Sequence, residues 1–264
     1  MDFLSSILVG LVQGITEWLP ISSTGQSMIA LMNFLKLEPE DAFSLAIYLH
    51  IGTLFAVLVK MRGEVKEIIL KLPKFREDKL VQFIITSTFF TGIVGLPVYL
   101  VLKGNFKMWA GDLVTALIGL FLILTGLMLY LSKKRIGGKD IADLNFLDMA
   151  SVGIAQGFTP LPGISRSGTT TAVLLFRNMR QDDALRLSFL MSIPAIIGAV
   201  FLEILQGGLE SFDSMAIPGI LSAFLFGYLT IDILLKFAKK TRFDFFCIVF
   251  GLVAIFFYLL ILAS

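Results

Sequence analysis

The stretch that decides the fold is GLVQGITEWLPISSTG at residues 10–25, which returns as GIAQGFTPLPGISRSG at residues 153–168. The two copies align without a gap and share seven of 16 residues, where unrelated sequences match at about one position. The first copy adds Glu17 and the second adds Arg166. Charged side chains inside apolar sequence are costly in a bilayer and mark a functional site by default. The repeat therefore predicts two related halves that meet at their polar segments.

Composition places the chain in a membrane. Of its 264 residues 56% are hydrophobic and 25 are Phe, and the mean hydropathy is +0.88. Soluble domains hold about 45–50% apolar residues. We predict an all-α polytopic membrane protein, because several runs reach the roughly 20 apolar residues that span a bilayer. The sequence predicts six membrane spans, at residues 42–60, 81–102, 108–132, 187–206, 215–235 and 244–263.

The two repeated motifs do not read as spans. Residues 3–18 form a short apolar leg, the Pro and Ser-Ser-Thr-Gly run interrupts it, and a second short leg follows at residues 26–35. The region 147–177 repeats this plan around its own Pro-Gly break. Broken backbone at membrane depth is tolerated only where protein buries it or a wet cavity lines it. Both regions are therefore predicted to be re-entrant helical hairpins whose tips face each other.

The basic residues predict the orientation. Eighteen Lys and Arg fall in four loops, and three fall on the opposite side, at Lys36, Lys103 and Lys107. This is a strong positive-inside bias. It makes the two hairpins enter from opposite sides, so we expect one membrane domain over residues 1–264 with an inverted-topology repeat, repeat 1 about 1–132 and repeat 2 about 147–264. The loops assigned to the cytoplasm are 60–80, 132–143, 177–186 and 236–242.

Glu17, Ser23 and Arg166 carry the chemistry that we expect. Glu17 could hold a divalent cation or act as an acid or base. Arg166 could clamp a phosphate with its planar fork. Hydroxyls and small residues around each turn could form an anion nest at a helix start. The candidate binding residues around them are Gln13, Ser22, Thr24, Gln26, Gln156, Ser165, Ser167, Gly168 and Thr169.

Simpler structural roles compete with some of these assignments. Gln13 and Gln156 stand at equivalent positions and could orient a ligand or simply bond the hairpins together. His50, the single histidine, lies within a span, where a structural role outweighs a catalytic one. Asp232 is expected to pair with a nearby Lys, and Cys247 to be an inert buried thiol. With one His and one Cys, a transition-metal site and a Ser-His-Asp triad are both poorly supported. The remaining set is typical of phosphate chemistry.

The motifs QGITEWLPISSTG and PGISRSGTTT resemble those of the undecaprenyl-diphosphate phosphatase family, the bacitracin-resistance phosphatases. The resemblance covers essentially the whole chain. It implies hydrolysis of a C55 polyprenyl diphosphate to the monophosphate, which recycles the lipid carrier of cell-wall synthesis and confers bacitracin resistance. It also implies a plasma-membrane protein with an active site open to the outer face and dependence on a divalent cation, Mg²⁺ or Ca²⁺.

The resemblance assigns roles to individual residues of this chain. The family's catalytic Glu corresponds to Glu17, which is also the expected metal ligand, its reactive serine to Ser23 and its catalytic Arg to Arg166. Many members carry histidine directly after the SSTG run, where this chain has Gln26. Glutamine cannot serve as a general base or accept a phosphoryl group. A histidine mechanism at that position is therefore excluded here.

The reading that follows is an integral membrane lipid-diphosphate phosphatase. The attacking group is Ser23 or a water activated at Glu17. The expected partners are a polyprenyl diphosphate and the bilayer, without nucleic acid, and with a homodimer left open. The alternative is a transporter that flips a phosphorylated polyprenyl lipid, because inverted repeats with broken helices are typical of transporters.

Overall fold

The computed structural model describes residues 2–106, 108–132, 137–206, 216–238 and 242–263, with the backbone alone at 234–238 and 261–263. Within these ranges the chain forms helices and no strand. Six helices are long and apolar enough to cross a membrane, which confirms the six predicted spans. They are α3 (Pro39–Lys60), α5 (Lys79–Phe106), α6 (Gly111–Ser132), α9 (Gln181–Leu205), α10 (Ala216–Ala238) and α11 (Phe243–Ala263).

Four shorter helices carry the repeated motifs. The longest of them has 14 residues, which at 1.5 Å per residue is about 21 Å, well short of the ~30 Å hydrocarbon core. They form two consecutive pairs, and the helical structure is interrupted between the two helices of each pair, at residues 17–22 and 158–165. The four are α1 (Phe3–Thr16), α2 (Ser23–Phe34), α7 (Phe146–Gly157) and α8 (Arg166–Phe176).

Local chemistry explains where the second helix of each pair begins. The Ser22 side chain caps α2 by accepting from the Gly25 amide, and Ser165 caps α8 by accepting from the Gly168 amide. Gly163 precedes the second cap with φ of 105°, a backbone conformation that side-chain-bearing residues rarely adopt. A Cβ there would also lie 2.4 Å from the carbonyl oxygen of Ile118. The motif glycine is thus needed for both conformation and space.

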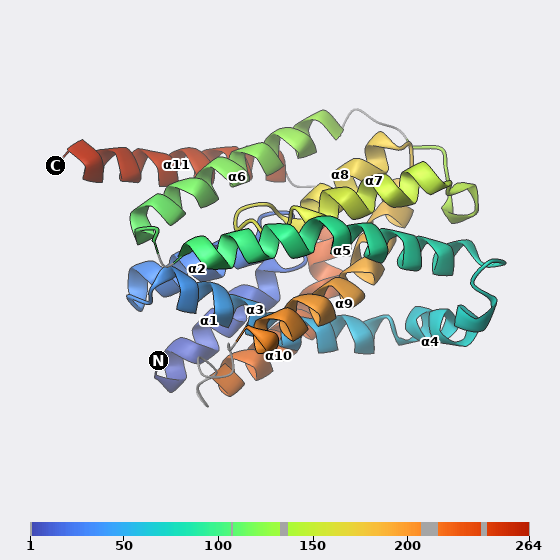
Figure 1. Ribbon diagram of the computed structural model, residues 1–264, viewed down its shortest axis with the longest axis horizontal. Helices are drawn as coiled ribbons and strands as arrows, with labels where there is room; N and C mark the ends of the chain where they lie inside the picture. The colour runs from blue at the N-terminus through green and yellow to red at the C-terminus, as the bar shows by residue number, and fades with distance from the viewer. Residues whose placement is uncertain (1, 107, 133–136, 207–215, 239–241, 264) are drawn as a thin grey trace.

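The helices pack in pairs drawn from opposite halves of the sequence. α1 packs on α10, α7 packs on α5, and α6 lies beside α11 (Figure 1). α3 and α9 contact each other and stand next to the two breaks. Figure 1 also shows α4 (Arg62–Lys71) at one end of the long axis, while α1 begins and α11 ends toward the other end.

Glycines set the register of the first two pairs in the same way. A Cβ on Gly10 of α1 would lie 2.1 Å from the carbonyl oxygen of Gly219 on α10. A Cβ on Gly153 of α7 would lie 2.4 Å from the carbonyl oxygen of Ser87 on α5. Such contacts require small residues, because the backbones approach closely. The equivalent motif glycines therefore make equivalent contacts in the two halves.

The sequence did not predict α4, which occupies the loop assigned to residues 60–80. None of its residues is buried, and Glu64 forms an ion pair with Arg186 at the start of α9, with Oε1 3.7 Å from Nε. Two one-turn 3₁₀ helices, η1 (Leu72–Lys74) and η2 (Ile141–Asp143), were also not predicted.

Asp148, to which the sequence assigned no role, fastens the ends of α7 and α8. Its buried carboxylate accepts from Arg177 Nε at 2.7 Å and from Lys139 Nζ at 3.1 Å. It also accepts from the Asn145 amide at 3.0 Å, which completes a capping box at the start of α7. Burying a carboxylate is tolerated because every one of these contacts supplies a donor. Asp148 therefore serves the fold.

Candidate active site

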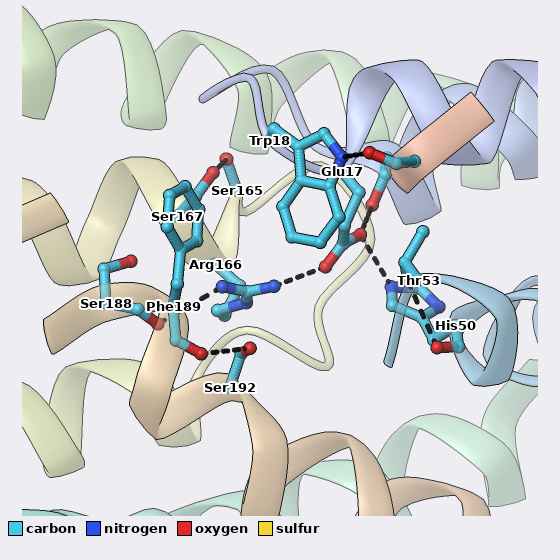
Figure 2. A network of polar contacts seen from close by, with 12 residues as sticks. Glu17, Trp18, His50, Thr53, Ser165, Arg166, Ser167, Ser188, Phe189 and Ser192 are labelled. Atoms are coloured by element: carbon cyan, nitrogen blue, oxygen red, sulfur yellow. Dashed lines mark hydrogen bonds and ion pairs between the residues drawn. The ribbon is translucent and has the colours of Figure 1, made fainter. Parts of the chain in front are cut away.

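Glu17 lies at the centre of a buried polar cluster, directly after α1, with 5% of its surface exposed. Its Oε1 forms an ion pair with Arg166 Nη2, which comes from the first residue of α8. Its Oε2 accepts from Ser23 Oγ at 2.5 Å and from Gln13 Nε2 at 3.0 Å. Figure 2 shows Glu17 between Arg166 on one side and His50 on the other. The two broken segments thus meet at one carboxylate.

His50 of α3 joins the cluster, which the sequence did not favour. Its Nε2 lies 3.3 Å from Glu17 Oε2, and its Nδ1 lies 2.7 Å from the carbonyl oxygen of Ala46. Both neighbours are acceptors, so both contacts are hydrogen bonds only when each ring nitrogen carries a proton. The signal available in the sequence was that the single histidine lies inside a span. What was missing was its distance from Glu17, which depends on how α3 packs.

Ser22 and Ser23 are neighbours with different surroundings. Ser23 Oγ donates to Glu17 and faces the cluster. Ser22 has φ of 61°, an unusual value for a residue with a side chain, and its Oγ accepts from the Gly25 amide at 3.3 Å and the Gly163 amide at 3.0 Å. Ser22 therefore ties one broken segment to the other, while Ser23 holds the hydroxyl next to the carboxylate.

The second broken segment is held by a parallel set of hydroxyl contacts. Ser167 Oγ donates to the carbonyl oxygen of Leu19 at 3.1 Å, which is a second link between the two segments. The Ser165 amide donates to Thr125 Oγ1 at 3.2 Å. Arg166 Nη1 donates to the carbonyl oxygen of Ser188 at 3.3 Å. The guanidinium is thus aimed at Glu17 by α8, on which it sits, and by α9, which its other nitrogen contacts.

Trp18, the neighbour of Glu17, is buried against α9 and α10. Its ring is 1% exposed and meets Phe189 edge to face, with ring centroids 5.5 Å apart. Its Nε1 donates to the carbonyl oxygen of Gly227 at 3.0 Å. A buried aromatic wall with a satisfied N–H keeps water away and fixes the backbone of its neighbour Glu17.

The cluster lines one end of a cavity of about 250 Å³. The first residues of α2 and α8 line the cavity here, and the first amides of a helix have no partner within it. Eight of the predicted site residues line the cavity: Glu17, Ser22, Ser23, Thr24, Gln156, Ser165, Arg166 and Ser167.

Four predicted site residues do not line the cavity. Gln13 is buried behind Glu17, to which its Nε2 donates, and its Oε1 accepts from Ser27 Oγ at 3.1 Å. Gln26 Nε2 donates to the carbonyl oxygen of Ile21 at 3.3 Å. Gly168 and Thr169 lie within α8. Nothing in the geometry brings these last three to the carboxylate.

The oxygen ligands at Glu17 suit a divalent cation that is also bound by phosphate oxygens. Among the described residues no three of His, Cys, Asp and Glu gather as a metal-ligand set. Glu17 is accompanied instead by the hydroxyl oxygen of Ser23, which is a hard ligand, while Gln13 presents its amide nitrogen. Mg²⁺ is commonly held by one or two carboxylates together with substrate phosphates. The donor set therefore fits a divalent cation shared with a diphosphate.

A second buried ion pair, which was not predicted from the sequence, lies beside the cavity. Glu203 of α9 is fully buried and pairs with Lys103 of α5. Tyr99, which lines the cavity, donates its hydroxyl to Glu203 Oε2 at 2.6 Å, and Lys103 Nζ lies 3.4 Å from Ser44 Oγ of α3. The sequence placed Lys103 in an outer loop. Its partner is 100 residues away, so no local pattern could reveal the pair.

Replacing Lys103 with Met is expected to lower the thermal stability of the purified protein strongly. The change leaves the Glu203 carboxylate buried without a cation, a loss that costs about 3–5 kcal/mol. Changing Lys103 and Glu203 to Met together should restore most of that loss, because two apolar side chains replace a buried pair at little cost. Melting of the single and double variants in detergent measures this. A double variant as unstable as Lys103→Met would contradict the pairing.

Comparison with known proteins gives a consistent match over the chain. The family model described as bacitracin resistance protein BacA matches residues 6–256. An undecaprenyl-diphosphatase of Methanothrix thermoacetophila is 44% identical over 258 residues, 97% of this chain and 96% of that protein. Undecaprenyl-diphosphatases of Methanococcoides burtonii and Methanopyrus kandleri are each 40% identical, over 95% and 97% of this chain and 96% of each relative.

Proposed function

The chain belongs to the bacitracin resistance protein BacA family, and from this premise we propose that it hydrolyses undecaprenyl diphosphate to the monophosphate and phosphate. It is a multi-pass membrane enzyme that recycles the lipid carrier of cell-wall synthesis. The observation that carries the proposal is a buried carboxylate held between a guanidinium and a serine hydroxyl, Glu17 between Arg166 and Ser23. The relatives named above are undecaprenyl-diphosphatases.

Binding begins with the diphosphate entering the polar end of the cavity. Arg166 turns from Glu17 to the phosphate oxygens, which its planar fork binds in pairs. The first amides of α2 and α8 add donors and the positive ends of two helix dipoles. This arrangement places the charge of the diphosphate on groups that are already oriented.

The reaction then needs a nucleophile and a base at the terminal phosphorus. Ser23 Oγ attacks, its proton passes to Glu17 along the 2.5 Å hydrogen bond, and the bond from phosphorus to the bridging oxygen breaks. Polyprenyl monophosphate leaves, and water activated by Glu17 then releases phosphate from the serine. Direct attack by a water activated at Glu17 gives the same products, with Ser23 orienting that water. Arg166 stabilises the charge that develops as the bridging bond breaks.

We also propose that a divalent cation takes part. Glu17, with Ser23 and the diphosphate oxygens, would hold Mg²⁺ or Ca²⁺, and the ion would supply charge neutralisation at the phosphate. The support is the pair of hard-oxygen ligands that the Glu17 carboxylate and the Ser23 hydroxyl provide.

The packing supports re-entrant hairpins in an inverted-topology repeat, which we propose as the membrane arrangement. In one pair α1 of the first half packs on α10 of the second half, and in the other α7 of the second half packs on α5 of the first half. The contact positions on the long helices, Gly219 of α10 and Ser87 of α5, are 132 residues apart. Gly119 of α6 and Gly251 of α11 contact each other reciprocally and are also 132 residues apart. A pseudo-two-fold axis relates such pairs. Helices α1, α2, α7 and α8 are each too short to span alone.

We propose that the site opens to the outer side of the membrane. α4 and the basic segment 60–80 to which it belongs lie at one end of the long axis (Figure 1). We assign that end to the cytoplasm of the plasma membrane by the positive-inside rule. The cavity extends from Glu17 toward Tyr99 and Leu202, near the ends of α5 and α9 that point away from α4. The site would therefore open to the outer side.

Phosphate release by purified protein in detergent tests the function. A lipid flippase moves its lipid without cleaving it, so it would release no phosphate from polyprenyl diphosphate in detergent. The proposed enzyme releases phosphate, and release falls when a chelator removes divalent cations. A protein that binds the lipid diphosphate in detergent without releasing phosphate would favour transport.

Ser23→Ala and Ser22→Ala are expected to fail in different ways. Ser23→Ala should lower turnover at least about ten-fold more than Ser22→Ala, because its hydroxyl faces Glu17. Ser22→Ala should instead lower thermal stability by about 1–3 kcal/mol, because two buried amides lose their acceptor. Turnover and melting of both variants in the same detergent separate the two. Equal turnover in both would contradict the roles given to these serines.

A further inference from the structure

The cavity is too small for the whole substrate. Its volume is about 250 Å³, below the roughly 300–1,000 Å³ of pockets that enclose drug-sized ligands. The diphosphate and the first carbons of a lipid fit beside Glu17 and Arg166. A polyprenyl tail must therefore leave the cavity through an opening in its wall.

Both α5 and α9 contribute small residues to the cavity lining, among larger ones. Gly92 and Gly95 line the cavity from α5, and Ala195, Gly198 and Ala199 line it from α9. The cavity therefore reaches α5 and α9 at these residues, and we call this part of it the slot.

The slot faces the bilayer. Ile93, which follows Gly92 on α5, is 53% exposed, and Ile197, which precedes Gly198 on α9, is 52% exposed. Apolar side chains exposed on helices that span a membrane contact lipid tails. A chain that passes through the slot therefore moves from the cavity directly into hydrocarbon.

Glycines at the slot differ from the packing glycines of this protein. A Cβ on Gly10 would collide with Gly219, as small residues at close helix contacts do. A Cβ on Gly92 or on Gly198 would meet nothing within 4 Å. Glycine in a helix interior costs stability relative to alanine. Close packing does not require glycine at Gly92 or Gly198, and the missing side chains leave open space beside the cavity.

A buried polar atom of a cavity-lining residue lacks a hydrogen-bond partner. Gln156 is 1% exposed, and its Nε2 donates to Thr91 Oγ1 at 3.1 Å. Its Oε1 has no hydrogen-bond partner among the described residues, although it is fully buried. A buried acceptor without a donor is costly.

We propose that the slot between α5 and α9 is the portal through which the isoprenoid tail passes from the active site into the bilayer, and that Gly92 and Gly198 set its width. The proposal rests on the proposed phosphatase function. An isoprenoid carries a methyl branch on every unit and needs more width than a linear chain. Two glycines whose missing side chains leave space, one on each helix, provide that width.

Filling the slot tests the portal. Gly92→Leu and Gly198→Leu each place a bulky side chain where no atom now lies. Gly104→Leu is the matched control, because Gly104 lies on the same α5, its Cβ would also meet nothing within 4 Å, and it does not line the cavity. The readout is kcat/KM for a 55-carbon polyprenyl diphosphate divided by kcat/KM for geranyl diphosphate. Melting temperatures check that each variant is folded.

The ratio is expected to fall about ten-fold or more in each leucine variant, the scale of excluding several carbons from an apolar site. It should fall further in the double variant, less in Gly92→Ala, and stay within about two-fold in Gly104→Leu. An unchanged ratio, or a proportional loss of both substrates in the slot variants, overturns the portal while the phosphatase function stands. A parent protein that hydrolyses neither substrate overturns both.

Discussion

Phosphate release is expected to fall by about 10²–10⁴-fold when Glu17 is replaced by Gln, the range that a positioned general base contributes. Gln keeps an acceptor oxygen for Ser23 but cannot take its proton or attract a cation. The Gln variant should also lose most of its response to added Mg²⁺. Turnover of polyprenyl diphosphate across a Mg²⁺ series measures both effects.

The Glu17 variant needs a folding control, because it leaves Arg166 without its anion in a mostly buried place. Glu17→Asp keeps the charge on a shorter side chain, so it should melt closer to the parent and yet turn over slowly. The melting temperature of both variants is therefore measured with turnover. A folded Gln variant with the parent's rate and Mg²⁺ response would remove Glu17 from the chemistry.

Arg166→Lys is expected to lower turnover by about 10²–10³-fold, the cost of losing one preorganised donor to the transition state. Lysine keeps the positive charge and can still pair with Glu17, but it lacks the planar fork that binds two phosphate oxygens. The loss should appear in kcat as well as in KM, since the fork acts most strongly as the bridging bond breaks.

Arg177→Lys is the matched control for this change. Arg177 is also an arginine paired with a buried carboxylate, that of Asp148, but it lies outside the cavity. We expect its turnover to stay near the parent value. If Arg166→Lys matched Arg177→Lys in kcat, the guanidinium of Arg166 would have no part in the transition state.

Much of the fold could be predicted from the sequence because hydrophobic length is a local property. The six spans were predicted from runs of about 20 apolar residues, and all six correspond to helices. α4 was not predicted, because it is short and its many charged residues lie within a basic loop. The pairing of Asp232 with a lysine was predicted from charge alone and is confirmed, with Lys60 as the partner.

The candidate site could be predicted where its residues share a motif. Glu17, Ser23 and Arg166 stand in the repeated motifs, and the structure brings them together. His50 could not be assigned, because its contact with Glu17 depends on the packing of α3. Gln156 was predicted from its equivalence with Gln13, yet it bonds Thr91 of α5 instead of a carboxylate. The sequence repeat therefore predicted that Gln156 lies at the site, but it did not predict which residues Gln156 contacts.

Hydrolysis in ¹⁸O-labelled water tests the central claim most directly, that this site attacks the terminal phosphorus of polyprenyl diphosphate. Purified protein is given the lipid diphosphate in detergent, and mass spectrometry reads both products. Attack at the terminal phosphorus, through Ser23 or directly by water, puts the heavy oxygen in the released phosphate and leaves the lipid monophosphate unlabelled. Label in the lipid monophosphate, or no release of phosphate by the folded protein, would contradict the account.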